Sequence, residues 1–116
     1  MAVAWRDDDR AAKALLPALR CLRQAGRVLL LAGVREGSPA PGLPPILVEH
    51  GIEAEMRVLP VEPRPFGARL LDEAHNVGAD MLVMGAFAHS RLREMVFGDV
   101  TRFMLEHADL PLLMRH

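Results

Sequence analysis

Short, uninterrupted apolar runs alternate along this chain with segments whose apolar residues recur every three or four positions. The run from Val28 to Ala32 is apolar at every position. A run of this length is typical of a strand that is covered on both faces, as in a parallel sheet. Similar runs lie at 2–5, 81–84 and 111–114, and the segment 53–59 alternates like an edge strand. The sequence therefore predicts five strands.

Helical periodicity fills the intervals between these strands. The spacing predicts helices from the aspartates at 7–9 to Gly26, from Pro44 or Pro45 to His50, and from Phe66 to Gly78. A last helix carries Val100, Phe103, Met104 and His107 on one face, which predicts a half-buried His107. Strands that alternate with helices predict one domain over residues 1–116, an open, doubly wound, five-stranded parallel sheet of order 3-2-1-4-5 with helices on both faces.

Composition narrows the classes of function. The net charge is −1, so the chain lacks the basic field of a nucleic-acid-binding protein. The longest apolar run is too short to cross a bilayer, and the charged first ten residues lack the apolar segment of a secretory signal. A single cysteine, Cys21, fits a reducing compartment. We expect a cytoplasmic protein that binds neither nucleic acid nor a membrane.

The residue pattern gives little support for a metal site or for catalytic residues. Asp7, Asp8 and Asp9 could ligate a hard cation, but consecutive residues at a helix start point in different directions, which favours helix capping. The five histidines show no spacing typical of zinc. Because no nucleophile, general base or metal set can be named, we predict no metal, no catalytic residues and no enzyme.

The segment after the fourth strand has the parts of a phosphate-binding loop. Gly85 ends an apolar run and Gly98 precedes a helix, and such a loop leading to a helix N-terminus can hold a phosphate. Within the loop, His89 and Arg91 are the candidate ligands, although Arg91 could instead pair with an acidic neighbour on the surface. Ligands of doubly wound sheets bind beyond the carboxyl ends of the strands, which adds the segments 6–7 and 33–34.

With these elements placed, the chain resembles the universal stress protein family over nearly its whole length. The resemblance is carried by Val3-Ala4-Trp5, Gly78-Ala79-Asp80-Met81-Leu82-Val83-Met84-Gly85, His89-Ser90-Arg91-Leu92-Arg93-Glu94, Gly98-Asp99-Val100-Thr101-Arg102 and Leu110-Pro111-Leu112-Leu113-Met114. It is most similar to the C-terminal halves of bacterial members that carry two such domains in tandem. The resemblance implies an adenine nucleotide alpha hydrolase-like fold. It also implies pairing through the last strand, by Leu110, Leu112, Leu113 and Met114, either in a homodimer or with a tandem partner domain.

ATP-binding members of the family carry a glycine, two residues, a second glycine, nine residues, and a third glycine followed by serine or threonine. Gly85 and Gly98 match the first and third glycines, but Ala88 replaces the second and Asp99 replaces the hydroxyl residue. A methyl group at 88 obstructs close backbone approach to a phosphate, and the Asp99 carboxylate would repel it. Arg6 stands where the family often has an aspartate. The resemblance thus implies a degraded nucleotide site formed by Arg6, Asp7, Val34, Gly85, Ala88, His89, Arg91, Gly98, Asp99 and Val100.

Three functions remain open from the sequence. We expect a stress-response module without a bound cofactor, which acts through dimerisation or protein interaction. The alternative is a module that binds ATP or another adenine nucleotide. A weak nucleotide hydrolase is the alternative of another class.

Overall fold

A computed structural model describes residues 1–5, 9–62, 66–85 and 100–115 of the chain. The elements follow one another in the order β1 (Ala2–Trp5), α1 (Asp9–Gln24), β2 (Leu29–Val34), α2 (Pro45–Glu49), β3 (Glu55–Pro60), α3 (Phe66–Asn76), β4 (Leu82–Gly85) and β5 (Leu112–Arg115). Residues 100–107 are also helical. Each predicted strand is present, with ends that differ from the prediction by one or two residues, as is usual for element ends.

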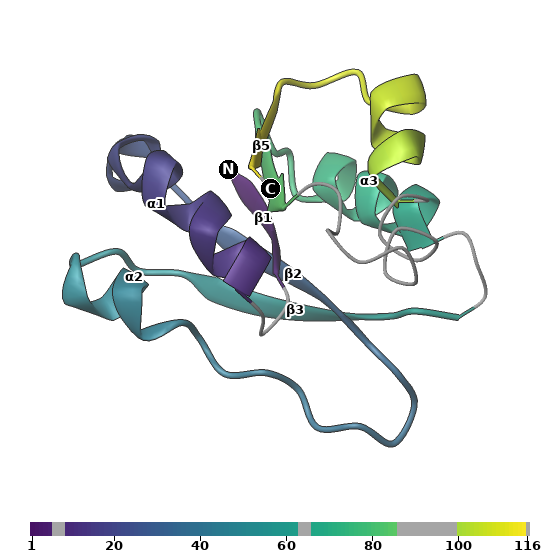
Figure 1. Cartoon of the computed structure of the whole chain (residues 1–116), viewed down its shortest axis with the longest axis horizontal. Coiled ribbons are helices and arrows are strands. Elements are labelled where there is room, and N and C mark those ends of the chain that lie inside the picture. The colour runs from purple at the N-terminus through teal and green to yellow at the C-terminus, as the bar shows by residue number, and fades with distance from the viewer. Residues whose placement is uncertain (6–8, 63–65, 86–99, 116) are drawn as a thin grey trace.

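The strands form a five-stranded sheet in the order β3-β2-β1-β4-β5, and every pairing is parallel (Figure 1). This confirms the predicted fold class and strand order. The register places Trp5 of β1 opposite Ala32 of β2, and Val83 of β4 opposite both Val3 and Leu113. β1, at the centre of the sheet, and its neighbour β2 are buried along most of their length, as continuous apolar runs predict.

Two apolar cores lie on opposite faces of the sheet. In the first core, Leu15 and Leu22 of α1 and Leu47 of α2 pack on β1, β2 and β4. In the second core, Leu70 of α3 and Met104 of the helix at 100–107 pack on the other face. Helices therefore cover both faces, and Figure 1 shows α1 and α2 on one side of the sheet and α3 on the other. The alternation of side chains along each strand divides the apolar residues between the two cores.

The third strand is covered unevenly. Ala54 and Met56 pack against the first core, but Val58 on the same side is 46% exposed, whereas Leu59 is buried in the second core. The reason is geometric, because α2 has only five residues and spans about 8 Å, whereas β3 extends for about 20 Å.

His107 differs from the expectation. Its side chain is 54% exposed, and its ring lies 4.4 Å from that of Phe103. The prediction of a half-buried His107 is wrong: residues 105–107 are exposed, whereas Met104 and Ala108, four positions apart on one helix face, pack in the second core.

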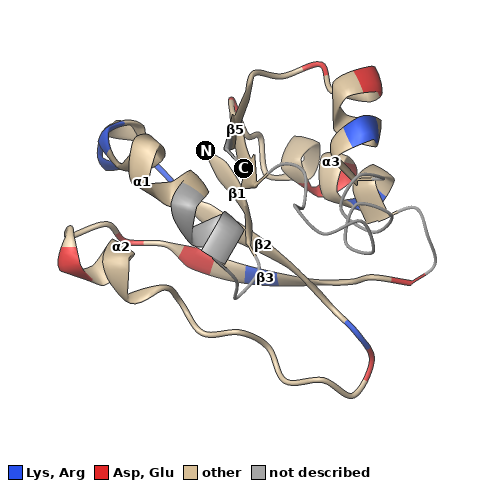
Figure 2. Cartoon of the chain, viewed as in Figure 1, with Lys and Arg blue, Asp and Glu red and all other residues tan. Residues whose placement is uncertain are grey.

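The surface carries both signs of charge. Arginine, aspartate and glutamate lie on the helices, on β3 and on the loop after β2 (Figure 2), in keeping with a net charge of −1. Among the described residues, no helix has both the length and the apolar character that crossing a membrane requires.

Candidate functional site

The strand order places a topological switch point between β1 and β4. From β1 the chain proceeds through α1 to β2 on one side, and β4 is later added on the other side of β1. In doubly wound sheets, ligands bind beyond the carboxyl ends of the strands at such a point. Trp5 ends β1 and Gly85 ends β4, so the segments 6–8 and 86–99 follow directly from the two strands that flank the switch point.

Three of the ten predicted nucleotide-site residues lie in the described part of the chain. Val34 ends β2 and Gly85 ends β4; both are half-buried, and they lie at the same edge of the sheet with β1 between their strands. Val100 begins the helix at 100–107 and packs against the second core. The other seven predicted residues lie outside the described ranges: Arg6, Asp7, Ala88, His89, Arg91, Gly98 and Asp99.

An apolar wall stands at the carboxyl end of β2, and sequence reasoning missed it. A β-carbon on Gly33 would lie 2.8 Å from Cζ of Phe66 and 2.9 Å from Cγ1 of Val61. The missing side chain at Gly33 therefore lets the first residue of α3 and the residue after β3 close over the strand end. A glycine inside an apolar strand often marks such a close approach, and this was the available signal.

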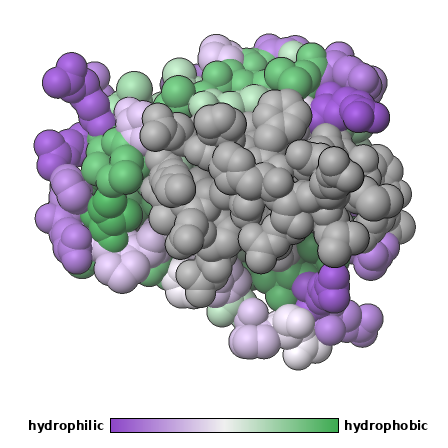
Figure 3. Space-filling model, viewed as in Figure 1, coloured by the Kyte–Doolittle hydropathy of each residue, from purple (hydrophilic) through white to green (hydrophobic). Residues whose placement is uncertain are grey.

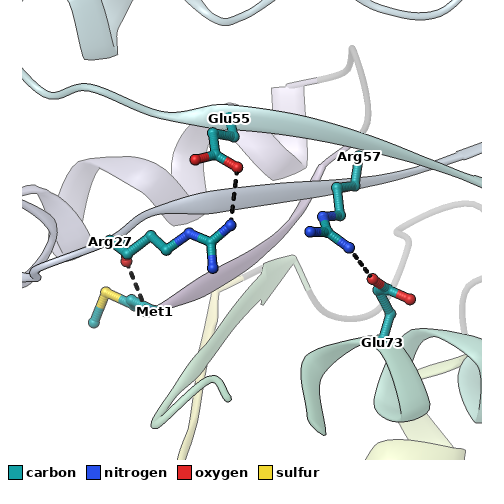
Figure 4. A network of polar contacts seen from close by, with 5 residues as sticks. All are labelled: Met1, Arg27, Glu55, Arg57 and Glu73. Atoms are coloured by element: carbon teal, nitrogen blue, oxygen red, sulfur yellow. Dashed lines mark hydrogen bonds and ion pairs between the residues drawn. The ribbon is translucent and has the colours of Figure 1, made fainter. Parts of the chain in front are cut away.

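Polar contacts join β3 and the segment that follows it to α3. Arg69 Nη1 donates to the carbonyls of Pro60, at 3.2 Å, and Glu62, at 3.1 Å, so the segment after β3 is tied to the helix. Nη1 of Arg57 on β3 donates to Oε1 of Glu73 on α3 at 2.9 Å (Figure 4). The Glu73 side chain is only 17% exposed, so this pair is partly shielded from water.

A second set of contacts braces the opposite edge of the sheet. Arg27 Nη2 donates to Glu55 Oε2 at 3.1 Å, and the Arg27 carbonyl accepts a hydrogen bond from the Met1 nitrogen at 2.9 Å (Figure 4). Arg27 precedes β2, Glu55 begins β3 and Met1 precedes β1. They position the strands and lie away from the carboxyl edge.

Trp5 is the second feature of this edge that sequence reasoning missed. Its side chain lies in the first core and the residue is 5% exposed. Its Nε1–H has no hydrogen-bond partner among the described residues. An unpaired buried donor costs about 1–3 kcal/mol, and such a group therefore calls for a local reason. The donor belongs to the last residue of β1, next to the switch point.

The described part of the edge supplies surfaces for binding. Within the described ranges, no three His, Cys, Asp or Glu side chains lie close enough together to hold a metal ion. Asp7 and Asp8, two of the three candidate cation ligands at 7–9, lie outside these ranges. What the edge offers is the apolar wall of Val61 and Phe66 and the strand-end backbone, which suit contact with a flat apolar group.

The predicted pairing strand lies at one edge of the sheet. β5 pairs with β4 along one side, and in the described part of the chain no strand pairs with its other side. Leu113 packs against the first core, whereas Leu110, Leu112 and Met114 pack against the second; all four are half-buried. Apolar side chains thus flank a free strand edge.

Comparisons with known proteins agree with this architecture. The model of the universal stress protein family matches residues 3–116. A universal stress protein from Archaeoglobus fulgidus is 21% identical with a TM-score of 0.70, and the alignment covers 97% of this chain and 94% of that one. A member of the family from Burkholderia pseudomallei is 24% identical with a TM-score of 0.63, over 98% and 94% of the two chains.

A third solved structure is a universal stress protein in complex with cAMP. It is 20% identical with a TM-score of 0.64, over 99% of this chain and 94% of that chain. The likeness to these structures shows the adenine nucleotide alpha hydrolase-like fold. A comparison with curated proteins finds no match.

Proposed function

The chain belongs to the universal stress protein family, and on that premise we propose that it is a stress-response module that acts by pairing through β5. In this proposal the nucleotide site is degraded and the protein is not an enzyme. The observation that carries the proposal is the free edge of β5 with its flanking apolar side chains. An unpaired edge of this kind is a template for pairing with another chain.

Symmetry determines the form that pairing takes. A twofold axis beside β5 brings the same strand from two copies together, and the two strands then run antiparallel. The sheet becomes continuous across both copies, and the half-buried side chains Leu112, Leu113 and Met114 lose their remaining exposure to water. Each of these burials is favourable at about 25 cal/mol per Å² of apolar area. A tandem partner domain would use the same edge.

The sequence of the segment between Gly85 and Val100 supports a degraded nucleotide site. Ala88 replaces a glycine that would allow close approach to a phosphate, and Asp99 adds a negative charge at the start of a helix. Two like charges about 4 Å apart cost about 4 kcal/mol at an effective dielectric constant near 20. That cost is comparable to the whole affinity of a weakly bound nucleotide, so we expect no resident cofactor.

Adenine-nucleotide binding is the second candidate function. The fold that this chain shares with a universal stress protein solved in complex with cAMP favours it. The apolar wall of Val61 and Phe66 at the end of β2 could contact an adenine ring. Weak hydrolysis of such a nucleotide is the remaining alternative, and no cluster of described residues that could hold a metal ion supports it. The free, exposed thiol of Cys21 supports a reducing, cytoplasmic location.

One experiment separates these candidates. Native mass spectrometry of the purified chain measures the oligomeric state and any co-purified nucleotide together. A dimer without nucleotide supports the proposal. A nucleotide bound in stoichiometric amount, in either oligomeric state, supports the second candidate and contradicts the degraded site. A monomer without nucleotide, with ultracentrifugation giving only monomer at 50–100 times the concentration, contradicts pairing through β5.

A further inference from the structure

A hollow of about 430 Å³ is lined by the second half of α1 and by His50. Helix α1 starts beyond the carboxyl end of β1 and returns to the start of β2, so its second half lies toward the amino ends of the strands. His50, which follows α2 and precedes β3, also lines the hollow. The hollow is therefore at the end of the sheet opposite the switch point. The hollow is open to solvent, so a ligand in it would stay partly exposed.

The hollow has an apolar part and a basic part. Leu16, Pro17 and Leu19 of α1 form the apolar part, and Leu16 is 57% exposed. Figure 3 shows hydrophobic surface edged by hydrophilic residues on the side of the molecule where α1 and α2 lie. Arg20 and Arg23 form the basic part, and no Asp or Glu is among the described residues that line the hollow.

The two arginines have no partner among the described residues. Arg27 and Arg57 form ion pairs with glutamates, but neither Arg20 nor Arg23 forms one. Neither has an acidic residue three or four positions away on α1, the spacing that forms ion pairs on a helix. The donors of both guanidinium groups are therefore available to an anion.

The end of α1 weakens this positive charge without cancelling it. A helix C-terminus carries about −0.5 of a charge, and Arg23 lies in the last turn of α1, where it compensates the dipole. Arg20 lies almost one turn earlier, so roughly one and a half positive charges remain beside the hollow. Two guanidinium groups can bind one carboxylate or phosphate in bidentate fashion.

His50 lines the same hollow as the two arginines, and a hydrogen bond holds its ring in place. Its Nδ1 lies 2.8 Å from the carbonyl oxygen of Ile46. Because a carbonyl only accepts, Nδ1 carries the proton, and Nε2 of the neutral ring is an acceptor. The arginines, and not His50, are therefore the donors available to an anion. Backbone hydrogen bonds from His50 and Gly51 to the carbonyls of Ile46 and Val48 close the same turn and position His50 at the hollow.

From these features we infer that the hollow binds a small amphipathic anion, a carboxylate or a phosphate monoester with a short aliphatic body. The anionic group pairs with Arg20 and Arg23, and the aliphatic body lies on Leu16, Pro17 and Leu19. Both halves are required, because ion pairs at an exposed surface contribute little alone and the apolar floor is small. This site does not depend on whether the carboxyl edge of the sheet binds a nucleotide.

The test is a titration of the ¹⁵N-labelled full chain, followed by amide and arginine side-chain chemical shifts. Octanoate and octyl phosphate represent the two sources of the anion, and octanol is the neutral control. We expect saturable shifts confined to the second half of α1 and to residues 46–51, with octanol binding at least tenfold more weakly. Tighter binding of one anion identifies the headgroup. Failure of both anions to saturate these resonances overturns the inference.

Matched variants separate the site from general charge. The double variant Arg20→Gln/Arg23→Gln should weaken binding of the anion at least tenfold. Arg35→Gln/Arg102→Gln removes the same charge from two other exposed positions and should change the affinity less than twofold. Equal weakening by both double variants overturns the inference.

The apolar half of the hollow has its own pair of variants. Leu16→Asp should abolish binding, whereas Leu105→Asp, at a position 61% exposed, should leave it unchanged. Melting temperatures within a few degrees of the parent show that each variant is folded. If Leu16→Asp is folded and binds normally, the aliphatic body does not lie in this hollow.

Discussion

The ring of Phe66 occupies the space that a side chain at position 33 would need. A β-carbon added to Gly33 would stand 2.8 Å from Phe66 Cζ, closer than real β-carbons approach any heavy atom. The first residue of α3 thus rests directly on the end of β2. This contact joins β2 to the helix layer at the carboxyl edge, where ligands of such folds bind.

Replacing this glycine should therefore reduce stability. Gly33→Ala forces Phe66 and Val61 to shift, which we expect to cost about 1–3 kcal/mol of unfolding free energy, the usual range for overpacking. Urea denaturation measures the loss. Gly26→Ala is the matched control, because nothing lies within 4 Å of a β-carbon there. Equal stabilities of the two alanine variants would show that the contact is not tight.

The two arginine–glutamate pairs should differ in strength. Arg57–Glu73 joins β3 to α3 at 2.9 Å with Glu73 17% exposed, whereas both partners of Arg27–Glu55 are more than half exposed. Double-mutant cycles with Gln substitutions should give a coupling of about 0.5–1 kcal/mol for the first pair and less than about 0.5 kcal/mol for the second. Repeating the cycles in 1 M NaCl should weaken the exposed pair more. A stronger exposed pair would contradict this reading of burial.

Repair of the loop should restore nucleotide affinity. Ala88→Gly with Asp99→Ser removes the obstructing methyl group and the repelling charge, and ATP affinity should rise at least tenfold if the two changes supply about 1.4 kcal/mol. Asp99→Ser alone should help ATP more than adenosine, because its effect is on phosphate. Calorimetry measures both. Low-micromolar ATP binding by the unmodified chain, or no gain after repair, would disprove the degraded site.

A charge on β5 should prevent pairing. Met114→Lys places an ammonium group on the strand proposed to join two copies, and we expect light scattering at micromolar concentration to change from dimer to monomer. Val48→Lys, at a position 71% exposed on α2, is the control and should leave the dimer intact. Because Met114 also packs against the second core, a melting curve must show that the variant is folded. A folded Met114→Lys dimer would exclude β5 from the interface.

Most of the fold was predictable because the signals are local. Continuous apolar runs and helical stripes identified the strands and helices, and their alternation led to the strand order that the structure confirms. Burial at the margins was less predictable, since it depends on the length of neighbouring elements. Val58 is exposed because α2 is short, and no pattern within β3 contains that information.

The site was predictable only in part. Val34 and Gly85 were placed correctly at the carboxyl edge, because the end of a parallel strand follows from its position in the chain. The contact between Gly33 and Phe66 joins segments far apart in sequence, so periodicity could not indicate it. The roles of Ala88 and Asp99 stay predictions, since both residues lie outside the described ranges.

The buried indole of Trp5 has a spectroscopic consequence. The chain contains one tryptophan and no tyrosine, so the emission excited at the long-wavelength side of the tryptophan absorption band arises from this side chain alone. Trp5 lies in the first core, where the indole is shielded from water, and it ends the strand beside the switch point. The emission should therefore be blue-shifted in the native state and move to longer wavelength as the core opens. A single intrinsic fluorophore thus reports the state of the first core without any label.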